Sequence, residues 1–176
     1  DIEHPIDYIS EPADILGGLT PALPLAVASA HGFTPEDEIP AVYVNHCMIQ
    51  QYVRYLVYID GEIRLVDSVE GLASIYAPVD SPDEALSFAI ASTGLSGVYD
   101  LHENRELKFY VASPEETYVR EVSGGYLVHL FSTYLCGCGP HVVKSVDVTV
   151  KTDGTIQLSD AVEVFSDPDL DGLCID

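Results

Sequence analysis

The clearest pattern of apolar and polar positions is a strict alternation across residues 142–151. Within it valine recurs at every second position from 146 to 150, with Val146, Val148 and Val150 set against Asp147, Thr149 and Lys151. A period of two places these two sets on opposite faces of an extended chain. We therefore predict a strand that buries one face and exposes the other to water.

Two hairpins are predicted where Asp-Gly pairs interrupt apolar runs. The first pair, Asp60 and Gly61, separates residues 52–59 from 62–67, and the second, at 153 and 154, separates 142–151 from 155–165. Asp-Gly favours a type I′ turn, because both central positions of that turn need positive φ. The two segments that begin at these turns agree at Asp, Gly, Ile, Leu and Asp. This agreement indicates either an internal duplication or the independent convergence of tight hairpins.

One helix has matching start and stop residues. Ser81 suits the N-cap, Pro82 suits the first turn, and Glu84 suits the position whose side chain reaches back to form a capping box. Apolar residues follow at helical spacing, and Gly94 suits the C-terminal cap. The sequence therefore predicts a helix over 82–93.

The other segments are less regular. Residues 107–111, 117–122 and 126–135 are predicted as strands, the last two joined by a turn at 123–125. The first 40 residues contain six prolines, at positions 5, 12, 21, 24, 35 and 40, which predicts an irregular segment wrapped around the core. Within it, Thr20 and Pro21 are expected to open a short helix that runs through Ala30 and ends at Gly32.

These elements predict an α+β fold. A mainly antiparallel sheet, made of a β-hairpin and a C-terminal β-meander, would pack on one principal helix at about 82–93, with the Pro-rich segment wrapped around it. The length of 176 residues suits a single domain over 1–176, with an irregular or short-helix segment at 1–40 and an α+β core at 41–176. A hydrophobic content of 47% is sufficient for such a core.

A capped helix that precedes a run of antiparallel strands resembles the arrangement of cystatin-like modules, in which a curved sheet wraps a helix. This resemblance concerns architecture and transfers no function. The inhibitory loop of cystatins has the form Gln-x-Val-x-Gly, whereas Gln51, Tyr52, Val53 and Arg54 are followed here by Tyr55 within a predicted strand. The departure argues against an inhibitory role, and a protease-inhibitor-like module is kept as an alternative.

The charge balance is strongly acidic, with 29 Asp and Glu against 7 Lys and Arg and a formal net charge of -22. Such a surface repels nucleic acid and anionic lipid, so we expect neither as a partner. Three interpretations of the acidity stay open: a well-solvated surface, adaptation to high salt, or affinity for cations. No stretch approaches the ~20 apolar residues of a membrane-spanning helix, so no transmembrane segment is predicted.

The location predicted for the chain is extracytoplasmic, meaning secreted, periplasmic or attached to the cell surface. Four cysteines, an even number, favour a disulfide framework, and disulfides persist in oxidising compartments. The sequence opens on Asp1 rather than Met. From this we expect that an export signal or a lipid anchor has been removed ahead of it.

The pairing of the cysteines is narrowed by their spacing. Cys136 and Cys138 lie two residues apart at a strand end, where side chains point to the same face and seldom bridge each other. Each therefore takes a separate partner. We favour Cys138 with Cys174 and Cys47 with Cys136, because the first bridge would tie the C-terminal tail to the sheet. Closing that loop contributes about 4 kcal/mol in the chain-entropy model.

Two other roles for the cysteines stay open. Imidazole and thiolate ligands of the kind that zinc or copper prefers are offered together by His46, Cys47, Cys136, Cys138 and His141. The C-x-C spacing fits structural zinc poorly. A cysteine nucleophile with a histidine base is the other alternative, although no local sequence resembles a known cysteine enzyme. His129, another candidate base, lies in a predicted strand and is expected to be a hydrogen-bonded sheet residue.

The C-terminal tail contains a candidate calcium site. Asp167, Asp169 and Asp171, followed by Gly172, match the D-x-D-x-D-G start of a calcium loop, and Asp176 adds a further carboxylate. Calcium is therefore the predicted cofactor candidate, with these four aspartates as its ligands. The bidentate Glu of an EF-hand would fall beyond the last residue, so a rigid turn with solvated carboxylates is the competing interpretation.

No nucleophile elbow, zinc-protease, P-loop or dinucleotide-binding motif occurs in the chain. We therefore expect an exported, non-enzymatic binding or structural module with a protein or small-molecule partner. Eleven tyrosines agree with this expectation, because tyrosine supplies contact area at interfaces. A calcium- or other cation-binding protein is one alternative. An enzyme whose site assembles from scattered residues is another.

Overall fold

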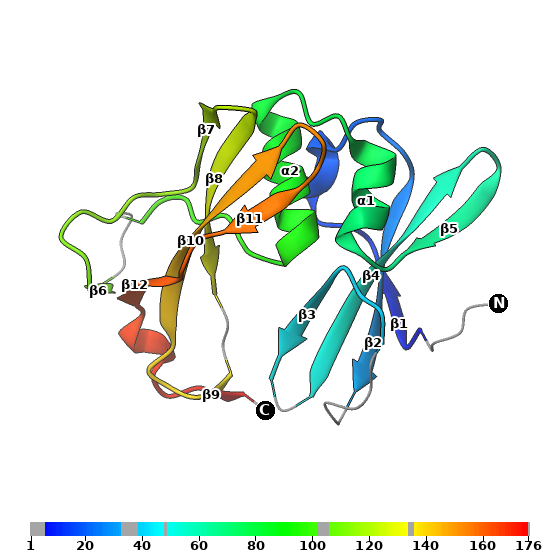
Figure 1. Ribbon diagram of the computed structural model, residues 1–176. Coiled ribbons are helices and arrows are strands. Elements are labelled where there is room, and N and C mark those ends of the chain that lie inside the picture. Colours follow the sequence, from blue (N-terminus) through cyan, green and yellow to red (C-terminus); the bar gives the residue numbers. More distant parts are fainter. Residues whose placement is uncertain (1–5, 33–38, 48, 102–105, 134–135, 176) are drawn as a thin grey trace.

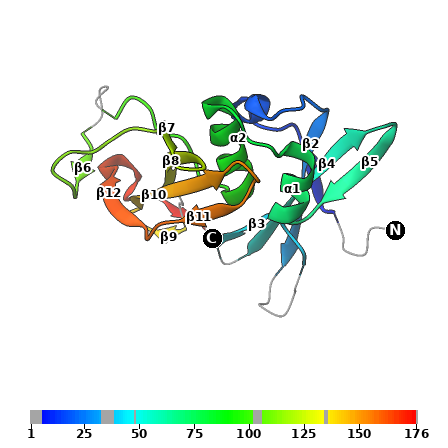
Figure 2. The ribbon, with the colours of Figure 1, turned by 45° about the horizontal axis from the view of Figure 1, so that its top comes forward.

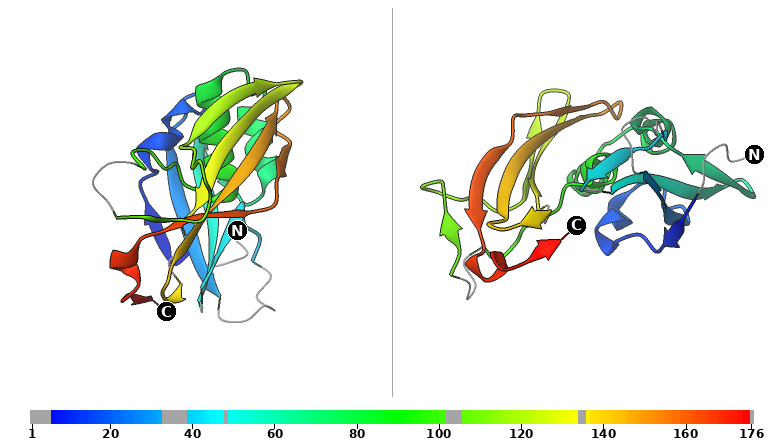
Figure 3. Two further views of the ribbon diagram at one scale, coloured as in Figure 1. Left: turned by 90° about the vertical axis from the view of Figure 1, so that its left-hand side faces the viewer. Right: turned by 90° about the horizontal axis from the view of Figure 1, so that it is seen from below.

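The structure is a computed structural model that describes residues 6–32, 39–47, 49–101, 106–133 and 136–175. It contains two larger sheets, here called the N-terminal sheet and the C-terminal sheet, with two helices between them (Figures 1 and 3). All the strand pairs described are antiparallel. The predicted α+β class with antiparallel sheets is therefore confirmed.

The N-terminal sheet has the spatial order β1-β2-β4-β3, with β5 also paired to β4. The predicted hairpin is confirmed, because Asp60 and Gly61 have φ values of 53° and 88° in the turn between β4 and β5. Figure 2 shows this hairpin at the edge of the molecule farthest from the C-terminal sheet. The strands are β1 (Tyr8–Ser10), β2 (Leu25–Gly32), β3 (Tyr43–His46), β4 (Gln50–Ile59) and β5 (Glu62–Val66).

The short helix expected from Thr20 to Ala30 is wrong. Residues 25–32 form β2, which pairs with β1 on one side and with β4 along its whole length on the other. Ala28 and Ala30 are fully buried there. Backbone pairing with two neighbours outweighs the local helix preference of alanine. The only helical turn described within 1–40 is the 3-10 helix η1 (Asp14–Gly18).

The helix predicted over 82–93 is confirmed as α2 (Pro82–Thr93). The Ser81 hydroxyl accepts the backbone N–H of Glu84 at 3.2 Å, and the Glu84 carboxylate accepts the backbone N–H of Ser81 at 3.0 Å, which completes the capping box. Gly94 ends the helix with a φ of 69°. Left-handed backbone at this position favours glycine.

A second helix, α1 (Val69–Tyr76), was not predicted, so the expectation of one principal helix describes α2 only. The Ser68 hydroxyl caps α1 by accepting the backbone N–H of Gly71 at 3.1 Å. With eight residues, α1 is too short to show a helical period in the sequence. Its inward residues Leu72 and Tyr76 are buried against the rest of the core, and that tertiary contact stabilises a helix of this length.

The C-terminal sheet has the order β6-β12-β10-β8-β7, with β11 also paired to β10. The alternating strand is confirmed as β10, in which Val148 and Val150 are fully buried. Residues 134–135 of the predicted strand 126–135 lie outside the described residues. The strands are β6 (Lys108–Phe109), β7 (Tyr118–Val122), β8 (Gly125–Ser132), β10 (Val142–Lys151), β11 (Ile156–Leu158) and β12 (Val162–Ser166).

Strands β4 and β10 have similar surroundings. Each has ten residues and is followed by an Asp-Gly turn. Each pairs with one eight-residue strand on one side, β2 or β8, and with two short strands on the other. The connections differ, because β3 precedes β4 whereas both β11 and β12 follow β10. The similar pattern of strand pairing around β4 and β10 supports the hypothesis of an internal duplication.

The main core lies between the two sheets. It joins Tyr55 and Val57 of β4 with Leu72 of α1 and with Val128 and Val148 of the C-terminal sheet. Four residues of α2 are fully buried in it: Ala85, Phe88, Ala89 and Ala91. Thus α2 is covered by two sheets rather than wrapped by a single curved sheet, and its small side chains allow that close approach. The two sheets and both helices therefore share one core.

A smaller core lies on the outer face of the C-terminal sheet, which faces away from the helices. Its buried members are Leu101, Phe131, Val143, Val164 and Phe165. The segment between α2 and β7 covers them. No helix among the described residues is long and apolar enough to span a membrane.

Candidate functional site

A polar row crosses the outer face of the C-terminal sheet. The strand register places Tyr118 of β7 opposite His129 of β8, and His129 opposite Asp147 of β10. Paired residues of antiparallel strands project to the same side. The chain neighbours Val128 and Leu130 are fully buried in the main core, so the row lies on the opposite face.

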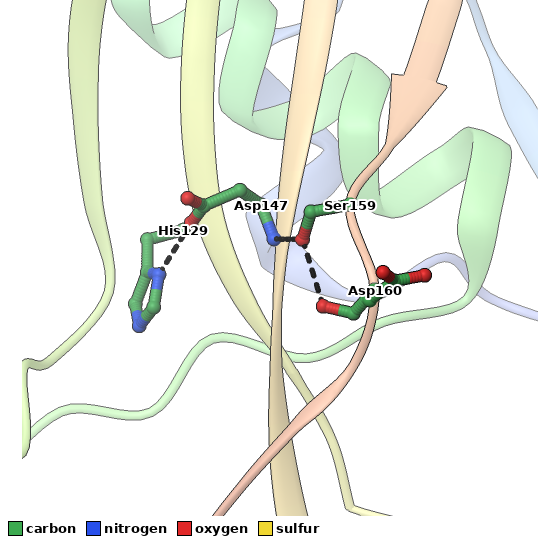
Figure 4. Close-up of polar contacts among 4 residues, drawn as sticks. All are labelled: His129, Asp147, Ser159 and Asp160. Carbon is green, nitrogen blue, oxygen red and sulfur yellow. Dashed lines mark hydrogen bonds and ion pairs between the residues drawn. The ribbon is translucent and has the colours of Figure 1, made fainter.

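His129 is held by contacts with three side chains. Its Nδ1 lies 2.6 Å from Oδ1 of Asp147 (Figure 4). Its ring stacks on the ring of Tyr118 with the centroids 5.0 Å apart, and it meets the ring of Phe131 at 86° with the centroids 5.2 Å apart. Only 12% of the imidazole side chain is exposed. The prediction that His129 is a hydrogen-bonded sheet residue is confirmed.

The surroundings of Tyr118 disfavour ionisation of its phenol. Burial raises the pKa of Tyr118 above its ordinary value of 10.0, and the negative charges of Asp147 and Glu115 raise that pKa further. At neutral pH the hydroxyl is therefore a hydrogen-bond donor and acceptor rather than a base.

Ser159 lies near this row but on the far side of Asp147 from the imidazole (Figure 4). Its hydroxyl accepts the backbone N–H of Asp147 at 3.0 Å and donates to the backbone carbonyl of Asp160 at 3.0 Å. These bonds tie the chain after β11 to β10. Among the described residues no hydroxyl or thiol is hydrogen-bonded to the imidazole of His129, so the row does not form a Ser-His-Asp triad.

The structure contains two disulfides, Cys47–Cys136 and Cys138–Cys174, in the pairing favoured from the sequence. The first joins Cys47, which follows β3, to Cys136, which lies between β8 and β10, and thereby links the two halves of the chain across a sequence separation of 89 residues. No cysteine is free. Because every thiol is oxidised, none is available as a thiolate ligand or as a nucleophile.

The second disulfide fixes the C-terminal tail. It connects β9 (Gly137–Cys138) with β13 (Cys174–Ile175), which pair as a small two-stranded sheet. His141, which is buried, places its Nε2 3.2 Å from the carbonyl oxygen of Leu173, and the backbone N–H of Gly139 donates to the same oxygen at 3.3 Å. Leu173 thus accepts two hydrogen bonds from the segment that leads into β10.

The aspartates of the tail form a capped turn. The carboxylate of Asp167 accepts the backbone N–H of Asp169 at 3.0 Å and caps the short 3-10 helix η2 (Pro168–Leu170), which Asp171 ends. Asp176 lies outside the described residues. In the described part of the chain, no group of three or more His, Cys, Asp or Glu side chains is arranged to hold a metal ion. Calcium binding by the tail stays a prediction.

An apolar surface covers one side of the β4–β5 hairpin. The register pairs Tyr58 with Ile63 and Leu56 with Leu65, so the four side chains project to the same side of the two strands. Ile63 is 70% exposed and Tyr58 is 48% exposed, while Leu56 and Leu65 are half-buried. These four residues are called the hairpin face. It points away from the main core, which takes Val57 from the opposite side of β4.

The hairpin face continues along β4 to a buried arginine. Arg54 is 1% exposed and is paired with Ala28 of β2. Burial lowers the pKa of this guanidinium, and the carboxylates of Asp67 and Asp7 act in the opposite direction. The cation and its carboxylate neighbours therefore add no net positive charge to this side of the sheet.

Two cavities among the described residues have few ionisable side chains. One of about 280 Å³ beside η1 is lined mainly by apolar and small residues, with Asp14 and Tyr76 as its polar side chains. Another of about 380 Å³ lies between α1 and the β10–β11 turn and has Glu70 and Asp153 as its ionisable side chains. There the carboxylate of Asp153 accepts the backbone N–H of Thr155 at 2.9 Å, a hydrogen bond within the turn itself.

Sequence reasoning missed the hairpin face, although the residues that form it were assigned to the correct strands. The Asp-Gly turn alone determines which residues of β4 and β5 are paired, so the Tyr58–Ile63 pair was within reach of the sequence. The exposure of this pair was not within reach of the sequence, because it depends on which side of the sheet the helices cover.

No family model, curated protein or solved structure matches the chain.

Proposed function

We propose that this protein is an exported, non-enzymatic binding module that docks a protein partner on the hairpin face. The main observation in support of this proposal is the exposure of paired apolar side chains, above all Ile63 at 70% and Tyr58 at 48%. Exposed apolar side chains that adjoin one another mark interaction sites more often than single exposed residues do. The surrounding surface belongs to a chain with a net charge of -22, in which an apolar patch stands out.

Export is supported by the oxidation of all four cysteines, which is typical of proteins outside the cytosol. Secretion, a periplasmic location and attachment to the cell surface through a lipid anchor are all compatible with the two disulfides. A binding role is favoured over catalysis because, within the described part of the chain, no hydroxyl or thiol is hydrogen-bonded to His129, and because the cavity beside η1 has only Asp14 and Tyr76 as polar side chains.

An inhibitory role of the cystatin kind is not supported by the position of the relevant segment. Tyr52, Val53 and Arg54 are buried in the middle of β4. A protease would need an exposed loop there.

Site-specific photo-crosslinking tests this proposal. A benzophenone-bearing residue at position 63 should form specific adducts when the protein is illuminated in the secreted and cell-envelope fractions of the organism that produces it. The same residue at position 158 is the matched control, because Leu158 is 54% exposed but lies on the other sheet. Excess wild-type protein should compete for the adduct, and excess Tyr58→Asp should not. Equal labelling at both positions, or none at 63, would refute the proposal.

A further inference from the structure

We propose that the partner adds an extended, cationic segment as a further strand at the open edge of β5. This inference rests on the proposed binding role of the hairpin face and specifies the chemistry of the partner. Strand addition uses backbone hydrogen bonds for affinity and alternate side chains for selectivity. The argument depends on the backbone of the edge, on the side chains beside it and on charge.

The backbone of β5 offers unpaired groups along its outer edge. Among the described residues β5 pairs with β4 alone. The backbone N–H of Tyr58 donates to the carbonyl of Pro24 at 3.0 Å, on the side of β4 away from β5. Tyr58 and Ile63 are therefore a non-hydrogen-bonded pair, and Ile63 directs its own N–H and C=O outward. By the same alternation, Leu65 does so too.

Two devices that often protect an edge strand, proline and a β-bulge, are absent from β5, and its charged residues Glu62 and Arg64 alternate with the apolar Ile63 and Leu65. It has five residues without proline or lysine, and its register with β4 runs from Tyr55 and Val66 to Ile59 and Glu62 without a bulge. By contrast, the pairing of β10 with β12 shifts at Val143. A regular edge with an apolar residue 70% exposed is suited to accept another strand.

The side chains define the pattern of the incoming strand. The two residues that present their backbone outward, Ile63 and Leu65, also belong to the hairpin face. Residues of the partner directly opposite them would lie beside these side chains. Apolar residues at every second position of the partner would therefore extend the hairpin face across one more strand.

Charge determines the residues between them. Residues 60–67, which comprise the hairpin turn, β5 and the residue after it, contain Asp60, Glu62 and Asp67 against the single cation Arg64. Arg64 lies 3.9 Å from Asp60, and the Asp60 side chain is 87% exposed. Lysine or arginine in the partner would complement Glu62 directly. The partner position opposite Arg64 meets a cation that is paired with Asp60, so a cationic residue is favoured there only by the net charge of -22. A second copy of the chain would bring another net charge of -22 and would be repelled.

Fluorescence anisotropy with short labelled peptides tests the inference. The probe alternates Lys and Val, and two controls are a peptide of the same composition in shuffled order and an analogue that alternates Glu and Val. We expect the Lys/Val probe to bind roughly tenfold more tightly than the shuffled peptide, a difference of about 1.4 kcal/mol, and the Glu/Val analogue not to bind. Equal binding of the shuffled peptide, or no binding of the probe, would overturn strand addition.

A backbone variant separates strand addition from side-chain contact. Ile63→Pro removes an N–H that points outward and is not used by β4, so the hairpin should persist. Ile63→Thr keeps that N–H and the strand preference and is the matched control. Binding of the Lys/Val probe should be lost in Ile63→Pro and largely retained in Ile63→Thr. Leu65→Pro tests the same point if thermal unfolding shows that Ile63→Pro disturbs the fold.

The two proposals fail in distinguishable ways. Suppose that a partner is crosslinked at position 63 and that excess Ile63→Pro competes for the adduct as well as excess wild-type protein does. The hairpin face then binds the partner, but strand addition is wrong. If no partner is crosslinked at position 63, the proposed function is wrong as well.

Discussion

Gly61 and Gly154 each follow an aspartate in a hairpin turn, but the turns differ, because φ is positive at both Asp60 and Gly61 in the first and at Gly154 but not at Asp153 in the second. Both glycines have left-handed backbone, with φ values of 88° and 81°. A Cβ atom at Gly61 would meet no atom within 4 Å, whereas one at Gly154 would lie 2.6 Å from Cβ of Ala73 in α1. The second turn is therefore packed against a helix, while the first projects into solvent.

Alanine at each glycine should separate backbone strain from crowding. Gly61→Ala should lower the free energy of unfolding by about 1 kcal/mol, because only the left-handed backbone is strained. Gly154→Ala should cost about 1–3 kcal/mol more, because the added methyl group must displace α1. Urea unfolding of both variants measures the difference. Equal losses would show that the second turn is not in contact with α1.

The Glu84 carboxylate makes the stability of α2 depend on pH. The backbone N–H of Asp80, 2.7 Å from the carboxylate, is the main cause that holds the pKa of Glu84 below its ordinary value of 4.5. The folded protein thus favours charged Glu84 more than the unfolded chain does. This contribution is present above about pH 4.5 and is lost as the pH falls through the folded-state pKa.

Glu84→Gln should remove this part of the pH dependence. Above pH 4.5 the variant should be less stable than wild type by roughly 1 kcal/mol or less, and the gap should close as Glu84 becomes protonated at lower pH. Thermal unfolding across pH 3 to 7, roughly the range over which carboxylates titrate, measures it. Asp83→Asn is the control, because Asp83 lies in the same turn outside the capping box. A gap that persists at the lowest pH would contradict the expectation.

At the scale of the whole molecule, like charges dominate. The net charge is -22, and the ion pairs between the described residues are few and partly exposed. Repulsion among carboxylates opposes the compact state, and salt screens it over a distance that falls from about 10 Å at 0.1 M to about 3 Å at 1 M. Screening therefore removes more repulsion than attraction.

The melting temperature should rise as sodium chloride is raised from low concentration. Choline chloride at equal ionic strength is the control, because it screens charge but does not offer a small cation for oxygen ligands. Equal increases would identify screening as the cause. A larger increase with sodium would favour specific cation binding, and a decrease with both salts would contradict the expectation.

Much of the secondary structure is determined by neighbouring residues and was therefore accessible from the sequence. The capping box at Ser81 and Glu84 fixes the start of α2, the Asp-Gly pairs fix both hairpins, and the period of two identifies β10. Each of these signals acts within a few residues of the chain. The spacing of Cys136 and Cys138 excluded a bridge between them and left two pairings, and the structure contains the one that was favoured because it ties the tail to the sheet.

Only the tertiary structure decided the features that depend on distant segments. Residues 25–32 become β2 rather than a helix because β1 and β4 pair with both of their edges. Contact with the core likewise stabilises α1. His129 meets Tyr118 and Asp147 through the register of three strands. Ile63 is exposed because the helices cover the other side of the N-terminal sheet, and the sequence near Ile63 contains no information about where those helices pack.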